Sequence, residues 1–542
     1  MNRRSFLQKG ATPATGFLAG ASLKNGDRDA RSWKDDGKST PAWSSSVQSS
    51  GDLSPYVPRA DKPWDEHRAA HLLRRAGFGF SWSDLNTALQ STPTALVDAM
   101  LKSSAAPAPP GSWVTQIPPT QITDTDRTQF YTWVRDMQEW WINLMMQPQN
   151  ALREKMVLFW HNHFVSEYTK VEVTQHLYNQ NQLFRQNAFG MFNDLTKKVS
   201  VDPAMLIYLD GATSRQGNPN ENYARELMEL FTLGAGAYKD GTPHYSEKDI
   251  VEMAKALTGW TVNGLTGEFK SARFDSGSKT IFGKTGNFGL APNTTNVIDH
   301  IFSQDDKDIV NHKRAAVYIC TKLYQFFVSE TPDMDIVAGM AQTLVDSYWM
   351  IGPVLKQLLT SEHFFDDNVI GAKIKSPADF VLGSMRQFSL TPAFARNNSD
   401  VARPETHDPN VAMAFLSQWL LYPPNVKGWL GGRTWISSAT VPLRIRYSKM
   451  WIEPIPGALP WNFNPVTFVK SLPDSDDAEK LLGHMIALLL PLGISDESKQ
   501  GLLDELLGGG PAYEWNPDAS NAATRIRACL IRMTNLGEYQ LM

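Results

Sequence analysis

Apolar and polar residues recur along most of the chain at the three- and four-residue spacing of amphipathic helices. The clearest example runs from Asn218 to Gly234, where one face would be apolar and the other charged. Asn218 suits the N-cap position, Pro219 the first helical position, and Glu221 follows the cap by three residues, as in a capping box. Gly234 is a typical C-terminal stop. We therefore predict a helix between Asn218 and Gly234.

A second helix is predicted from Ser246 to Gly259. Ser246 is followed three residues later by Asp249, which again fits a helix start. Apolar residues then recur at helical spacing until Gly259. Further along the amino-terminal half, the segment Arg153–Val165, REKMVLFWHNHFV, is apolar on nearly all sides, which predicts a buried helix.

Helical periodicity covers most of the remaining chain, so the predicted fold is mainly α. We expect a large multi-helix single domain over residues 63–542. Residues 261–289 lose the helical period and alternate Gly, Ser and Thr with isolated apolar residues. This stretch predicts a small β insert around 261–289.

The chain begins with a targeting segment. Arg3 and Arg4 precede Phe6 and a mildly apolar run, and small residues at 19–21 suit a cleavage site. This pattern resembles a twin-arginine signal peptide over residues 1–21, a route that typically carries folded proteins. A general secretory signal is the alternative. Residues 22–62 are rich in Ser, Asp, Lys, Gly and Pro and predict a disordered leader. We therefore expect a periplasmic or extracellular protein.

Composition narrows the class of function. The formal net charge of −4 over 542 residues argues against nucleic acid as the main partner. The apolar run of the predicted signal peptide is too short to span a bilayer, and no other uninterrupted apolar run reaches that length, so no integral membrane segment is expected. Cys320 and Cys529 are the only cysteines, which excludes an all-cysteine metal site. Both lie in apolar helical patterns and are interpreted as buried thiols, with a disulfide left open.

The polar face of the first predicted helix carries the strongest candidate chemistry. It presents Glu221, Arg225, Glu226 and Glu229, with Asn220 as a candidate substrate contact. The functional interpretation is a site wall, with carboxylates as acid–base groups or metal ligands. The alternative is a solvated helix face, since Glu221–Arg225 and Arg225–Glu229 have the spacing of surface ion pairs.

Two histidines extend this hypothesis. His161 and His163 lie in the predicted buried helix, where polar groups require partners. They are candidate proton carriers or metal ligands, and the alternative is a pair of satisfied core histidines. Two residues apart, they point to different sides of a helix and converge on one ion only if the helix ends there. Asp202 is a further candidate acid, and a divalent metal stays open as a cofactor.

The segment PPNVKGWLGGRTW, residues 423–435, predicts a loop fixed by its prolines and glycines. Lys427, Trp429 and Arg433 on this loop would suit an anion or a sugar ring. A packed structural loop is the alternative.

Several of these segments together resemble the domain of unknown function 1800 family. They are HLLRRAGFG, FWHNHF, DPAMLIYLDG, NENYARELMELFTLG, YSEKDIVEMAKALTGW, KLYQFFV, PPNVKGWLGGRTWI and the terminal EYQLM. The resemblance covers about residues 64–542 and implies an exported bacterial protein, often encoded beside a second uncharacterised exported family. A His-Asp pair common in this family is absent here, because Phe274 precedes Asp275. This departure weakens any metal site that draws a histidine from that loop.

These observations lead to two hypotheses of different class. The first is an exported hydrolase-type enzyme with a His/Glu/Arg site that acts on an envelope or environmental polymer. The second is a non-catalytic binding or assembly module that works with the co-encoded exported partner.

Overall fold

The computed structural model describes residues 51–102, 105–394, 407–453 and 463–542. In these residues helices dominate, and the strands form three two-stranded sheets between Trp260 and Asn296. The predicted mainly α fold with a small β insert is confirmed, and the insert extends to residue 296. The predicted signal peptide and most of the predicted leader lie outside the described residues, and the assignment of 63–542 to one domain stays a prediction.

The helices of the amino-terminal half are α2 (Glu66–Ala76), α3 (Trp82–Leu89), α4 (Pro93–Leu101), α5 (Asp124–Met145), α6 (Ala151–His163), α7 (Tyr168–Val171), α8 (Thr174–Gln186), α9 (Phe192–Ser200), α10 (Pro203–Tyr208), α11 (Glu221–Glu226), its π-helical continuation η6 (Leu227–Thr232) and α12 (Glu247–Ala256). Short 3₁₀ turns are η3 (Ser112–Thr115), η4 (Pro148–Asn150), η5 (Gly211–Thr213), η7 (Ser271–Arg273), η8 (Gly432–Trp435), η9 (Ala512–Glu514) and η10 (Gly537–Gln540).

The helices of the carboxyl-terminal half are α13 (Val297–Phe302), α14 (Arg314–Phe327), α15 (Met334–Asp346), α16 (Ile351–Leu359), α17 (Pro377–Gln387), α19 (Pro409–Phe415), α20 (Thr440–Ile452), α21 (Pro465–Lys470), α22 (Ala478–Leu489), α23 (Asp496–Leu507) and α24 (Ala522–Thr534). None of the helices in the described residues is both long and apolar enough to cross a bilayer.

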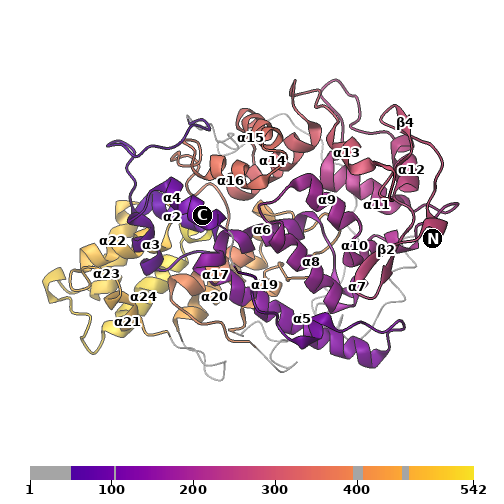
Figure 1. The fold of residues 1–542 in the computed structure, drawn as a ribbon. Coiled ribbons are helices and arrows are strands. Elements are labelled where there is room, and N and C mark those ends of the chain that lie inside the picture. The colour runs from indigo at the N-terminus through magenta and orange to yellow at the C-terminus, as the bar shows by residue number, and fades with distance from the viewer. Residues whose placement is uncertain (1–50, 103–104, 395–406, 454–462) are drawn as a thin grey trace, which may run out of the picture.

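The strands pair locally. The hairpin of β1 (Trp260–Asn263) and β2 (Thr266–Phe269) is antiparallel, as is that of β3 (Lys279–Ile281) and β4 (Lys284–Gly286). The two short strands β5 (Phe288–Gly289) and β6 (Thr295–Asn296) are parallel. In Figure 1 these strands lie at the end of the molecule opposite α21–α24.

Helix α6 lies at the centre of the molecule (Figure 1) and packs against α2, α4, α5 and α8. Its residues are buried on almost every side, as the pattern of the sequence predicts. The buried apolar side chains form one continuous cluster that runs from Tyr56 to Tyr539. Cys320 and Cys529 belong to this cluster as free, buried thiols.

The predicted disordered leader is wrong for its last residues, 51–62. Tyr56 is buried, and its backbone amide donates to the carbonyl of Thr360 over 2.8 Å. Arg59 and Lys62 both contact the carboxylate of Glu362, at 2.7 and 2.9 Å. An aromatic anchor and two ion pairs thus fix this segment to the end of α16, although its composition is typical of a leader.

Candidate functional site

The two candidate histidines stand at the carboxyl end of α6, and both are only 2% exposed. Nε2 of His163 lies 3.0 Å from the carbonyl oxygen of Phe231. The ring of His161 packs 5.6 Å from Trp141 and 5.7 Å from Trp429, and its buried Nε2 has no partner among the described residues. The helix ends here, yet the two rings do not converge. Burial lowers the pKa of both, that of His161 to about 4, so both are neutral near pH 7.

Asn162, between these histidines, fixes the loop of residues 423–435 to the end of α6. Its Oδ1 accepts from the Trp429 amide over 2.7 Å, and its Nδ2 donates to the Trp429 carbonyl over 3.1 Å. Gly428 has φ +72°, and a Cβ there would lie 2.2 Å from Asn162 Oδ1. Only glycine therefore fits this position. Trp429 is buried, as in the packed-loop alternative, whereas Lys427 and Arg433 lie on exposed parts of the loop.

Helix α11 begins two residues later than predicted. Asn220, not Asn218, is the N-cap, and its side chain accepts from the amide of Asn222 over 2.8 Å. Asn218 instead exchanges backbone hydrogen bonds with Arg215 in the preceding turn. Asn220 Nδ2 also donates to the carbonyl of Asp210. The amide proposed as a substrate contact therefore holds the start of the helix.

After Glu226 the helix widens into the π-helical turn η6, which the sequence period does not predict. Side chains from other elements satisfy the carbonyls at its end. Tyr318 donates to Leu230 over 2.8 Å, Arg314 donates to Leu233 over 2.7 Å, and His163 contacts Phe231. Unpaired carbonyls at a helix end require such partners. His163 thus supports the turn that carries the candidate carboxylates, and π-helical turns are frequent at functional sites.

Arg225 pairs with α12 rather than with Glu226. Its guanidinium forms a two-pronged ion pair with Glu247 of α12, at 3.0 and 2.8 Å. Glu221, largely exposed, lies 4.0 Å from the same guanidinium. Both residues fit the solvated-face interpretation. The adjacent α12 explains the arrangement, because its capping box at Ser246 and Asp249, confirmed in the structure, places Glu247 in the first turn.

Glu226 differs from every other acid on this helix. It is half-buried, and among the described residues it has neither a hydrogen-bond nor an ion-pair partner. Burial raises its pKa, Glu229 raises it further, and Lys427 and Arg225 oppose this shift. Lys427 lies about two hundred positions away in sequence, so the structure brings the loop of residues 423–435 to the acidic face of α11.

Two tyrosines complete this neighbourhood, and the sequence interpretation missed both. Tyr245 Oη donates to Glu229 over 3.4 Å. Burial, Glu167 and Glu226 raise the pKa of Tyr208, at the end of α10, to about 12. We call Tyr208, Glu226, Glu229, Tyr245 and Lys427 the Glu226 cluster. Tyrosines at helix ends look like core residues in a sequence, so no local signal marked them.

Lys322 of α14 is a third residue that the sequence interpretation passed over. Its ammonium group lies 5.3 Å from the ring centre of Tyr318, next to η6. Burial lowers its pKa to about 8. The available signal was a lysine at the start of the apolar segment KLYQFFV, because a charged side chain is rarely enclosed there without a structural or functional reason.

Asp202 lies at the start of α10, the helix whose end carries Tyr208 of the Glu226 cluster. It caps α10 by accepting from the Met205 amide over 3.1 Å, and it accepts from Gln180 over 2.8 Å. Burial raises its pKa to about 7, against the effect of these bonds. In the part of the chain that the structure describes, no three His, Cys, Asp or Glu side chains lie close enough to share a metal ion.

Comparison with curated proteins and with solved structures finds no match for the chain. One family model does match, over residues 71–534, nearly the whole chain. That range includes α6, η6 and the loop of residues 423–435, whose contacts are described above. The chain therefore belongs to the DUF1800 family, proteins of unknown function.

Proposed function

We propose that this protein is an exported hydrolase-type enzyme in which Glu226 is the acid–base group. The observation that supports this proposal most directly concerns the contacts of Glu226. Among the described residues it is a half-buried carboxyl without a hydrogen-bond or ion-pair partner, at the junction of α11 and the π-helical turn. Structural carboxyls of this chain, such as Asp202, have bonded partners instead.

The electrostatics of the Glu226 cluster suit proton transfer. A general acid or base works best when its pKa lies near the working pH. Burial and the neighbouring Glu229 raise the pKa of Glu226 toward that range, while Lys427 limits the shift. Glu229 would be the second carboxyl, as in sites where two carboxyls divide the acid and base roles.

The substrate class follows from the surroundings and the expected location. Tyr208 and Tyr245 flank the two carboxyls and offer an apolar ring with a polar hydroxyl, as sugar-binding surfaces do. Lys427 would orient an anionic or hydroxylated substrate. The predicted signal peptide at residues 1–21 supports export by the twin-arginine route, so the proposed substrate is a polymer of the envelope or the surroundings.

The test compares fragment release by the purified mature chain and by Glu226→Gln. Candidate polymers include peptidoglycan sacculi and neutral and acidic polysaccharides, with soluble fragments as the readout. We expect Glu226→Gln to slow release by at least about a hundredfold while polymer binding is retained. Glu479→Gln is the matched control, because it makes the same change on the exposed first turn of α22. Release by Glu226→Gln at the wild-type rate would exclude the proposed role.

A second candidate, a binding or assembly module, is supported by the polar groups of α6. Asn162 and His163 bond to backbone atoms of Trp429 and Phe231, which suits structural locking. This candidate predicts that no polymer is cleaved and that a co-encoded exported partner co-purifies in stoichiometric amount. Cleavage that depends on Glu226 would favour the enzyme.

A further inference from the structure

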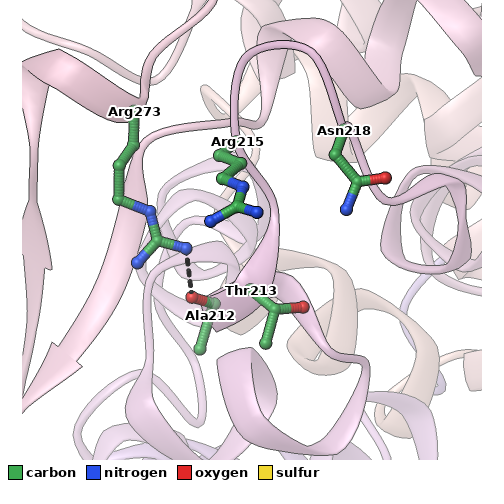
Figure 2. Close-up of a pocket in the computed structure, with 5 residues that line it drawn as sticks. All are labelled: Ala212, Thr213, Arg215, Asn218 and Arg273. Atoms are coloured by element: carbon green, nitrogen blue, oxygen red, sulfur yellow. Dashed lines mark hydrogen bonds between the residues drawn. The ribbon is translucent and has the colours of Figure 1, made fainter.

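A depression of about 380 Å³ lies between the turn that precedes α11 and the 3₁₀ turn η7. Its lining residues are Ala212, Thr213, Arg215, Asn218 and Arg273. Figure 2 shows the guanidinium groups of Arg215 and Arg273 side by side over Ala212 and Thr213, with the Asn218 amide across from them. This pocket is separate from the Glu226 cluster and shares no residue with it.

Backbone bonds fix the walls of this pocket. Arg215 and Asn218 close a tight turn through two backbone hydrogen bonds, and Gly217 within it has φ +80°. The amide of Gln216 donates to the carbonyl of Arg273 over 2.7 Å, which joins this turn to η7. Arg273 Nη2 donates to the carbonyl of Ala212, also over 2.7 Å. The two arginines are therefore brought together without any ligand.

The charge of the two arginines is not neutralised locally. Within the described residues, the Arg215 side chain has no ion pair or hydrogen bond, and the buried Nε of Arg273 has no acceptor. No carboxylate lines the pocket. Asp210, the acid next to it in sequence, is already paired with Lys170 at 2.7 Å. Two like charges held together favour an anion between them.

The chemistry of the donors defines the class of anion. Guanidinium groups present fixed N–H forks that match the oxygens of phosphate or sulfate. Two positive charges match a doubly charged group better than a single carboxylate. The Asn218 amide adds a neutral donor, and the volume falls in the range of small-ligand pockets. We propose that this pocket binds a tetrahedral oxyanion, the phosphate or sulfate group of a ligand.

The proposal is tested by calorimetric titration of the mature chain at constant ionic strength. The probes are inorganic phosphate, sulfate, methyl phosphate and acetate. We expect phosphate or sulfate to bind and acetate to bind at least about tenfold more weakly. Methyl phosphate shows whether the natural ligand is an ester or the free ion. If it binds as tightly as inorganic phosphate or more tightly, the ligand is esterified. If it binds more weakly, the ligand is the free ion. Both of these outcomes support the site.

The diagnostic variant is Arg215→Gln, because this exposed side chain supports no other described contact. It should weaken phosphate binding at least about tenfold. Arg273→Lys, which keeps the charge but loses the fork, should weaken it as well. Arg532→Gln is the control. Like Arg273, Arg532 donates to a backbone carbonyl, that of Gly501, but its Nη1 also lies 3.8 Å from Glu505 Oε2.

Three results would overturn the proposal: no heat of binding with millimolar phosphate or sulfate, acetate binding as tight as phosphate, or unchanged binding in Arg215→Gln. Because the readout is binding, each result stands whether or not Glu226 is catalytic.

Discussion

The carboxyls of Asp202 and Glu226 show how hydrogen-bond partners distinguish a structural acid from a candidate catalytic one. Burial raises the pKa of both Asp202 and Glu226. Asp202 accepts hydrogen bonds from Gln180 and from the Met205 amide, whereas Glu226 has no such partner among the described residues. The sequence marked both as candidates, because a single sequence shows residue type but not hydrogen-bond partners.

Asp202 should make stability fall as pH rises. Its pKa is raised from 3.8 to about 7 in the folded state, so the folded chain holds its proton where the unfolded chain has lost it. The Asp202 contribution is therefore complete below about pH 4 and is lost as pH rises toward 7. At about 1.4 kcal/mol per pKa unit, the free energy of unfolding should fall by up to about 4 kcal/mol across this range.

The measurement is urea unfolding of the wild-type protein and Asp202→Asn between pH 4 and 7. Asparagine is also a good N-cap, so the variant should fold, and the difference between the two curves should change across this window. A constant difference in unfolding free energy would show that Asp202 does not titrate there.

At the scale of elements, local chemistry predicted the start of α12 but placed the start of α11 two residues too early. The capping box of Ser246 and Asp249 is set by residues three positions apart and is present as predicted. The π-helical turn was not predictable, because its carbonyls are satisfied by Tyr318, Arg314 and His163 from α14 and α6. Such contacts leave no mark in the local period.

The same limit applies to the candidate site. The sequence indicated Glu226 and Lys427 separately, but only the packing of the loop of residues 423–435 brings them together. Arg225 was expected beside Glu226, and the docking of α12 on α11 gives it Glu247 instead. Contacts between distant segments therefore decide which predicted residues share a site.

The contact between Gly428 and Asn162 predicts that this loop is sensitive to a single methyl group. Gly428→Ala would strain a backbone at φ +72° and meet Asn162 Oδ1 at 2.2 Å. We expect its unfolding free energy to fall by about 1–3 kcal/mol. Gly483→Ala is the matched control, since Gly483 lies in α22 with nothing within 4 Å.

The unfolding free energy of Gly483→Ala should rise by about 0.5–1 kcal/mol, because alanine loses less backbone freedom than glycine when it enters a helix. Urea unfolding of both variants checks the pair. Equal effects of the two substitutions would contradict the proposed contact.

At the scale of the whole molecule, both ends of the described chain are tied to its middle. Residues 51–62 bond to the end of α16, and the carboxyl-terminal Met542 exchanges backbone hydrogen bonds with Lys373. With one continuous core from Tyr56 to Tyr539, the chain is expected to fold as a unit. A route that exports folded proteins suits such a molecule.

If the protein is exported by the twin-arginine route, the double variant Arg3→Lys, Arg4→Lys should stay inside the cell. The reason is that the ammonium group of lysine does not reproduce the planar N–H fork of the guanidinium group. Cell fractionation measures the exported share. Arg28→Lys with Arg31→Lys, beyond the predicted signal, is the control and should be exported normally. Normal export of the first double variant would favour the general secretory route.

We propose that η6 and the loop of residues 423–435 hold Glu226 half-buried and, within the described residues, without a hydrogen-bond or ion-pair partner. The most direct test of this arrangement is a carbon-13 NMR titration of glutamate side-chain carboxyls, with the Glu226 resonance identified by its absence in Glu226→Gln. We predict a midpoint clearly above the ordinary value of 4.5 and a further rise in Lys427→Gln, because Lys427 opposes the shift. A Glu226 midpoint at or below 4.5 would contradict the account.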